Sequence, residues 1–428
     1  MNAETCRLPR HRVYRLCAGA TCGLITVMLA AFTITVACPP PPVVAAGLGG
    51  NDAYQSISNP AYQHRVKHFA RLENSIRGLL VTDMSNGRLA GNSEEIIATV
   101  DPAKHSPRIN FINNVGEDVQ VATRIAYRAI KLRYPEIQPG RINFSFADQY
   151  DAVDGNSASC ACAVLMLSLL ENTHLDRTMA ITGAITADWR VRAVGGLEAK
   201  IHGAIADHLT GVVVPQSNGR NVCDVMLLDG PQTAWRIQIF SVRTLKQAMA
   251  MMRRNKPRDI SYAMLLFETL QKKFDRNGLG ALHDPATIER LRQITSLAPN
   301  DLSAQYLLEL AAGKQPKRLS IGATMYEAFA AIQFYSAYLW DDPPPNAPLL
   351  GSPIRDSLRR LNKLSEIGSL RCLPLVETLR RFVRTCGNWA GTPNGPIHIA
   401  RRHNQVMAEL DRLNGNKEDI DRMMRSGF

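Results

Sequence analysis

Short apolar runs alternate with longer amphipathic segments between residues 75 and 255. Two β-rich runs, 78–82 and 96–100, lie on either side of the turn sequence Ser85-Asn86-Gly87 and predict a hairpin. Further strands are predicted over 141–146, 179–182, 191–194, 211–215 and 236–240. Helices are predicted over 117–134, 158–170, 197–209 and 244–254. This alternation of strands and helices is typical of an α/β domain.

The predicted helices differ in the surface that they should bury. Over 117–134, apolar positions repeat with helical spacing, so this stripe is expected to face the core. Its members are Val121, Ile125, Ala129 and Leu132. The segment 158–170 is almost uniformly apolar and small, and such a helix is expected to be buried on all sides.

After residue 256 the pattern changes to helices alone, with a proline-rich break over 343–348. The 428 residues suffice for two or three domains with cores of their own, which excludes a scaffold held together by disulfides. We therefore predict four segments along the chain. They are a signal peptide or membrane anchor with a proline-rich stem (1–50), a linker (51–74), an α/β domain (75–255) and an all-α helical domain (256–428).

The first segment is typical of an export signal or a signal anchor. Four arginines precede an uncharged stretch over 16–38, which is longer than the roughly 7–15 apolar residues of a cleaved signal and close to the ~20 that span a bilayer. This favours a retained anchor, with the rest of the chain extracytoplasmic, on the periplasmic side if the source is bacterial. Secretion after cleavage near Val44-Ala45-Ala46, lipidation at Cys38 and cytoplasmic retention are the alternatives.

The net charge of +12 on its own suggests a nucleic-acid or membrane partner. However, the excess is spread along the chain, with +3 over 1–50, +3 over 51–255 and +6 over 256–428. No concentrated basic run with interleaved aromatic residues occurs, so nucleic acid is not predicted as a partner.

The cysteines and histidines predict no metal centre and no cofactor. There is no CxxC or HExxH motif, and His64 and His68 have helical i,i+4 spacing without a third ligand nearby. Cys160 and Cys162 are expected to pack in the core. For Cys372 and Cys386 two alternatives stay open, a disulfide and two buried thiols.

Two motifs place a serine and a lysine at the beginning of predicted helices. Ser157 follows a glycine-containing turn, where unpaired N–H groups and the helix dipole favour an oxyanion. Lys200 lies one turn into a helix with an apolar face, so its amine is a candidate for burial. Lowering a lysine pKa from about 10.4 to 7–8 requires roughly 3–5 kcal/mol, after which the amine can act as a base for serine. On spacing alone, a serine at the start of a helix is more typical of a helix cap, and a lysine is more typical of a solvated side chain.

The segment from about 75 to 254 resembles the proteolytic domain of Lon proteases. Residues 154–159 are similar to the family's Asp-Gly-Pro-Ser-Ala-Gly motif, and 195–200 to its Gly-Gly-Leu-x-x-Lys motif. The separation of 43 positions between serine and lysine is also that of the family. Residues 179–186 are similar to its Met-Thr-Gly-Glu-Ile-Thr stretch.

The resemblance implies a role for each matched residue. Ser157 would be the nucleophile, Lys200 the general base and Thr182 the hydroxyl that orients the lysine, with Asp154 and Gly155 supporting the serine turn. It also implies an α/β (α+β) fold, a polypeptide substrate and a ring-shaped homo-oligomer. Three positions depart from the motifs and put catalytic efficiency in question. They are Asn156 for proline, Ser159 for glycine and Ala184 for glutamate.

The sequence contains no G-x-x-x-x-G-K-[ST] phosphate loop of the kind an ATPase module would carry. We therefore expect an ATP-independent serine endopeptidase, exported or tethered to a membrane through 16–38, that cleaves unfolded or exposed polypeptide segments. The alternative is a catalytically weak or inactive Lon-like scaffold whose helical domain binds a protein partner.

Overall fold

The computed structural model of the chain describes residues 71–83, 89–101, 108–112, 115–135, 140–146, 156–340 and 351–414. The predicted signal or anchor, the linker up to residue 70, the hairpin turn at 85–87 and the proline-rich break lie outside the described residues. None of the described helices is both long enough and apolar enough to cross a membrane.

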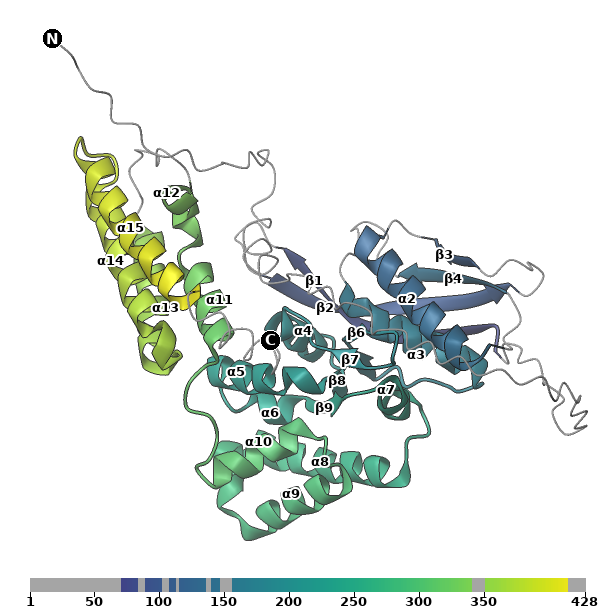
Figure 1. Ribbon diagram of the computed structural model, residues 1–428. Helices are drawn as coiled ribbons and strands as arrows, with labels where there is room; N and C mark the ends of the chain where they lie inside the picture. Colours follow the sequence, from purple (N-terminus) through teal and green to yellow (C-terminus); the bar gives the residue numbers. More distant parts are fainter. Residues whose placement is uncertain are drawn as a thin grey trace, which may run out of the picture. The chain divides into compact units, whose positions relative to one another are not determined.

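The described residues include a mixed seven-stranded sheet with the strand order β3-β4-β2-β1-β5-β8-β9 (Figure 1). Its strands are β1 (Glu73–Asp83), β2 (Leu89–Asp101), β3 (Arg108–Phe111), β4 (Arg141–Phe146), β5 (Met179–Ile181), β8 (Gly211–Pro215) and β9 (Gln238–Val242). β1 pairs with β2 in an antiparallel hairpin, as predicted, and β2 with β4 likewise. β1, β5, β8 and β9 are parallel neighbours. β6 (Ala184–Ile185) and β7 (Val191–Arg192) form a separate two-stranded ribbon.

Helices alternate with the strands along the chain, as predicted, and a last helix follows β9. They are α2 (Glu117–Arg133), α3 (Ser159–Leu170), α4 (Leu197–Ala206), α5 (Gly219–Asp229), α6 (Thr233–Arg236) and α7 (Leu245–Met252). α3 packs against β1, β2, α2 and α7, and all of its residues up to Leu169 are buried. The prediction of a helix buried on all sides is therefore confirmed.

The predicted buried stripe of α2 is wrong. Val121, Ile125 and Leu132 are 44%, 38% and 78% exposed, and only Ala129 of that stripe is buried. The buried positions are instead Val119, Ala122, Thr123, Ala126, Ala129 and Ile130. Three of these six residues are alanines, and α2 packs against α3. Helical spacing alone does not distinguish the two apolar faces of α2.

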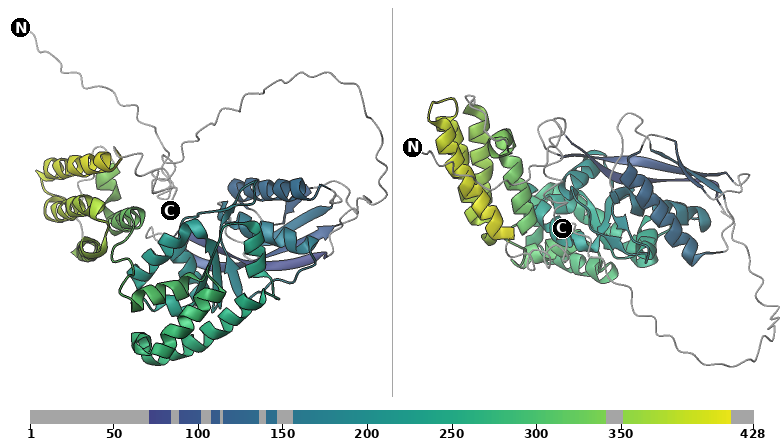
Figure 2. Two further views of the ribbon diagram at one scale, coloured as in Figure 1. Left: turned by 60° about the horizontal axis from the view of Figure 1, so that its bottom comes forward. Right: turned by 45° about the horizontal axis from the view of Figure 1, so that its top comes forward.

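The chain after Met252 forms helices, as predicted. These are α8 (Arg258–Asn277), α9 (Pro285–Leu297), α10 (Leu302–Ala311), α11 (Ile321–Ala331), α12 (Ser336–Trp340), α13 (Gly351–Ile367), α14 (Leu373–Trp389) and α15 (Gly395–Asn414). The core that includes the sheet continues through α8–α10 to Leu307, so the domain division at residue 255 stays a prediction. Figure 2 shows α14 beside α13 and α15.

Cys372 and Cys386 are free and buried, so the disulfide alternative is wrong. Cys372 is the N-cap of α14, and Cys386 lies fourteen residues further along the same helix. At 1.5 Å per residue they are about 21 Å apart, whereas a disulfide requires Cα atoms within roughly 7 Å.

Candidate active site

Ser157 lies in a 3₁₀ turn, η1 (Asn156–Ala158), that leads directly into α3. Its carbonyl oxygen accepts hydrogen bonds from Gly183 N at 3.0 Å and from Thr182 Oγ1 at 3.5 Å. Cys160 N in turn donates to Gly183 O at 3.0 Å. The structure therefore brings the predicted nucleophile and Thr182 together, with Thr182 contacting the serine backbone. Asp154 and Gly155 lie outside the described residues.

Ser159, which replaces the glycine of the Lon serine motif, stabilises this turn through hydrogen bonds of its side chain. Its buried hydroxyl donates to Asn156 O at 2.6 Å and accepts from Ile185 N at 3.0 Å. The departure from the motif thus adds a link between η1 and β6 that glycine cannot form.

Lys200 is the chemically most unusual residue among those predicted. Its side chain is on α4 and is only 1% exposed. No carboxylate forms an ion pair with it in the described part of the chain, and burial lowers its pKa to about 7. A substantial fraction of this amine is therefore neutral near neutral pH and able to accept a proton.

Close backbone contact with β2 holds α4 where it buries Lys200. A Cβ atom built on Gly203 would lie 2.4 Å from the carbonyl carbon of Gly91, and one built on Gly91 would lie 1.8 Å from Ala199 O. Only glycine permits this approach. Because Ala199 directly precedes Lys200, the glycine contact fixes the backbone at the lysine.

Asn218, which the sequence analysis did not single out, fixes the approach to α4. It is fully buried in η2 (Gln216–Asn218), and its side-chain amide accepts from Val194 N and donates to Val194 O, both at 3.0 Å. Val194 immediately precedes the Gly195-Gly196 pair of the lysine motif. In the sequence, the role of Asn218 is indicated only by its position soon after an apolar strand.

The groups of the site converge at the carboxyl ends of three parallel strands. Thr182 and Gly183 follow β5, and Asn218 follows β8. A Cβ on Gly196, which has φ +66°, would lie 3.0 Å from Val81 near the end of β1. This edge of a parallel sheet is where ligands typically bind in α/β proteins.

Ser157 Oγ and Lys200 Nζ form no hydrogen bond with each other in the described residues. In unliganded enzymes, catalytic hydrogen bonds are often long and tighten only when substrate binds. The two nearby thiols are not competing nucleophiles, because burial raises the pKa of both Cys160 and Cys162 to about 12.

Residues 82–250 match the family model of the Lon protease (S16) C-terminal proteolytic domain. The chain is 28% identical over 227 residues to an archaeal Lon protease of Thermoplasma volcanium, covering 50% of this chain and 34% of that protein. It is 32% identical over 167 residues to an archaeal Lon protease of Thermococcus kodakarensis, covering 38% and 25%. The chain therefore spans about a third or less of the length of these relatives.

Replacing Lys200 by methionine should stabilise the protein. In the unfolded chain the amine titrates near 10.5, so the wild-type fold is penalised by roughly 3–5 kcal/mol at or below pH 7. Lys200→Met should remove this penalty, and its advantage should shrink as the pH rises from 7 towards 10.5. Urea unfolding of both proteins at several pH values measures the difference; an equal or lower stability of Lys200→Met at pH 7 would contradict the buried neutral amine.

Adding a methyl group to Gly203 should displace α4 from β2. Gly203→Ala should lower the free energy of unfolding by roughly 1–3 kcal/mol, because its Cβ meets backbone atoms that cannot move aside. Gly219→Ala in α5 is the matched control, since no atom outside the local helix lies within 4 Å of its new Cβ. Urea unfolding should show a loss for the first variant only, and equal stabilities would refute the backbone contact.

Proposed function

Because residues 82–250 belong to the Lon protease proteolytic-domain family, we propose that this chain is a serine endopeptidase with a Ser157–Lys200 catalytic dyad. The observation that carries the proposal is the buried amine of Lys200, which has no carboxylate partner among the described residues and a pKa of about 7. Such an amine can take the hydroxyl proton of serine without a histidine.

In the proposed mechanism, neutral Lys200 accepts the proton of Ser157 Oγ as this oxygen attacks the carbonyl carbon of a peptide bond. The N-terminal turn of α3, which begins two residues after Ser157, stabilises the resulting oxyanion through its dipole and through N–H groups other than Cys160 N, which donates to Gly183 O. The Lys200 ammonium then donates its proton to the departing amine, which leaves an ester on Ser157. Water, deprotonated by Lys200, hydrolyses this ester and restores both residues.

The proposal includes cleavage without ATP, supported by the absence of a phosphate-loop motif in the 428 residues. Without an unfolding motor, the substrates would be unfolded or exposed polypeptide segments. The arginines and the uncharged stretch over 16–38 support an exported or membrane-tethered enzyme. A homo-oligomeric ring is proposed from the family resemblance alone.

The second candidate is an inactive Lon-like scaffold, and the absence of a Ser157–Lys200 hydrogen bond in the described residues favours it. Such a scaffold, however, gives no reason for a fully buried lysine that has no carboxylate partner among the described residues. The burial costs stability, and an exposed lysine would avoid this cost. We therefore place the peptidase first.

Removal of either dyad residue should abolish cleavage of casein in the absence of nucleotide. Ser157→Ala and Lys200→Met should each lower the initial rate at least about a hundredfold, since one loses the nucleophile and the other the base. Ser261→Ala and Lys272→Met, at the helical surface, are the matched controls and should retain wild-type rates. If wild type and both dyad variants cleave equally, or none cleaves, the peptidase proposal fails.

The dependence of kcat/KM on pH should follow the protonation state of Lys200. Because neutral Lys200 is the active form, kcat/KM for an unfolded fluorogenic peptide should rise from pH 6 through an inflection near 7 and then level off. His202 is the other titratable group tested on this helix, and its hydrogen bond to Asp229 raises the pKa of its imidazole. Because we assign the inflection to Lys200, it should persist in the His202→Gln variant, which lacks the imidazole. A flat profile, or loss of the inflection in His202→Gln, would contradict the assignment to Lys200.

A further inference from the structure

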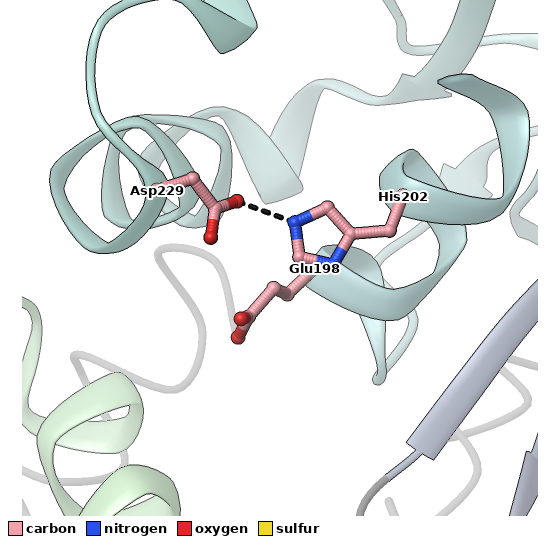
Figure 3. Close-up of side chains that lie close together, drawn as sticks. All are labelled: Glu198, His202 and Asp229. Carbon is pink, nitrogen blue, oxygen red and sulfur yellow. Dashed lines mark hydrogen bonds and ion pairs between the residues drawn. The ribbon is translucent and has the colours of Figure 1, made fainter. Parts of the chain in front are cut away.

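Glu198, His202 and Asp229 bring one imidazole and two carboxylates together outside the Ser157–Lys200 site (Figure 3). Glu198 and His202 are four residues apart on α4, and Asp229 is the last residue of α5. His202 Nε2 lies 2.6 Å from Asp229 Oδ2, and one ligand atom from each of the three residues lies within 4.8 Å of the others.

The cluster occupies the opposite side of α4 from Lys200. Two positions along a helix correspond to a rotation of about 200°, so Glu198 and His202 face away from the buried lysine between them. The side chain of His202 is 48% exposed and that of Asp229 is 24% exposed, so an ion can reach the cluster from solvent. The proposed peptidase mechanism uses none of the three residues.

The supporting backbone on both sides of the cluster is fixed. The glycine contact with β2 holds α4, and hydrogen bonds hold the end of α5. There, Gln232 Nε2 donates to Asp229 O, and Lys363 Nζ donates to Leu228 O at 2.8 Å. Ligands on such rigid elements need little ordering when an ion binds.

We propose that Glu198, His202 and Asp229 bind one divalent transition-metal ion of the zinc class, which connects α4 to α5. Imidazole and carboxylate oxygen are ligands that Zn²⁺ prefers, at about 2.0–2.2 Å, whereas Mg²⁺ and Ca²⁺ prefer sites of oxygen alone. Tetrahedral coordination separates two such ligands by about 3.3 Å. His202 Nε2 and Asp229 Oδ2 would therefore move apart by less than an ångström from their present 2.6 Å, and water would complete the coordination.

The chemical alternative is that His202 and Asp229 form only an ion pair. The two are distinguished by titrating the full-length protein with Co²⁺, followed by visible absorption, and then displacing Co²⁺ with Zn²⁺. Cobalt is informative because the chain has nine cysteines, and thiolate ligands add a near-ultraviolet charge-transfer band that an imidazole and carboxylate site lacks.

We expect one equivalent of Co²⁺ to bind with visible bands and no thiolate band, and Zn²⁺ to displace it. His202→Gln and Asp229→Asn should weaken this binding at least about tenfold, while Asp229→His, which keeps a ligand atom, should retain it. His208→Asn removes an exposed histidine just beyond α4 and should bind like wild type. Circular dichroism checks that each variant is folded.

The metal proposal is overturned if the folded His202→Gln and Asp229→Asn variants bind Co²⁺ as wild type does, if no Co²⁺ binds, or if every absorption band is of the thiolate type. Each of these results leaves the cluster as an ion pair alone. Because binding is measured without any substrate, failure here is independent of the peptidase proposal.

Discussion

The close contact between α4 and β2 is the constraint on which the candidate site depends. Gly203 and Gly91 let the two backbones approach to a distance that any side chain would prevent. Lys200 is carried on this helix and is buried without a carboxylate partner in the described residues, which lowers its pKa to about 7. The fold thus accepts an unfavourable burial, as is common where a base must function near neutral pH.

The remaining contacts of the site fix loops at the ends of parallel strands. Gly183 N and Thr182 Oγ1 hold the carbonyl of Ser157 after β5, and Asn218 holds Val194 after β8. These hydrogen bonds involve backbone atoms, so they position the two motifs without occupying the Ser157 hydroxyl or the Lys200 amine. Ser159 adds a further link in the same turn, which shows that a departure from a family motif can support its geometry.

The sequence predicted the structure correctly where the local pattern of apolar and polar residues matches the burial of those residues in the fold. The hairpin, the alternation of strands and helices and the fully buried α3 all follow from residue type and spacing. It failed for α2, since both faces of that helix are apolar and the choice between them depends on the packing of α3. It also left the state of Cys372 and Cys386 open, which the length of α14 decides.

By itself, the sequence determined the α/β pattern, the helical region after residue 256 and the two motifs that carry Ser157 and Lys200, because these depend on residues near one another in the chain. Only the tertiary structure decided that Lys200 is buried, that Thr182 contacts the serine turn and that Asp229 meets His202. The physical reason is that desolvation and hydrogen bonding depend on which distant segments pack around a group, and the spacing of residues along the chain does not specify that packing.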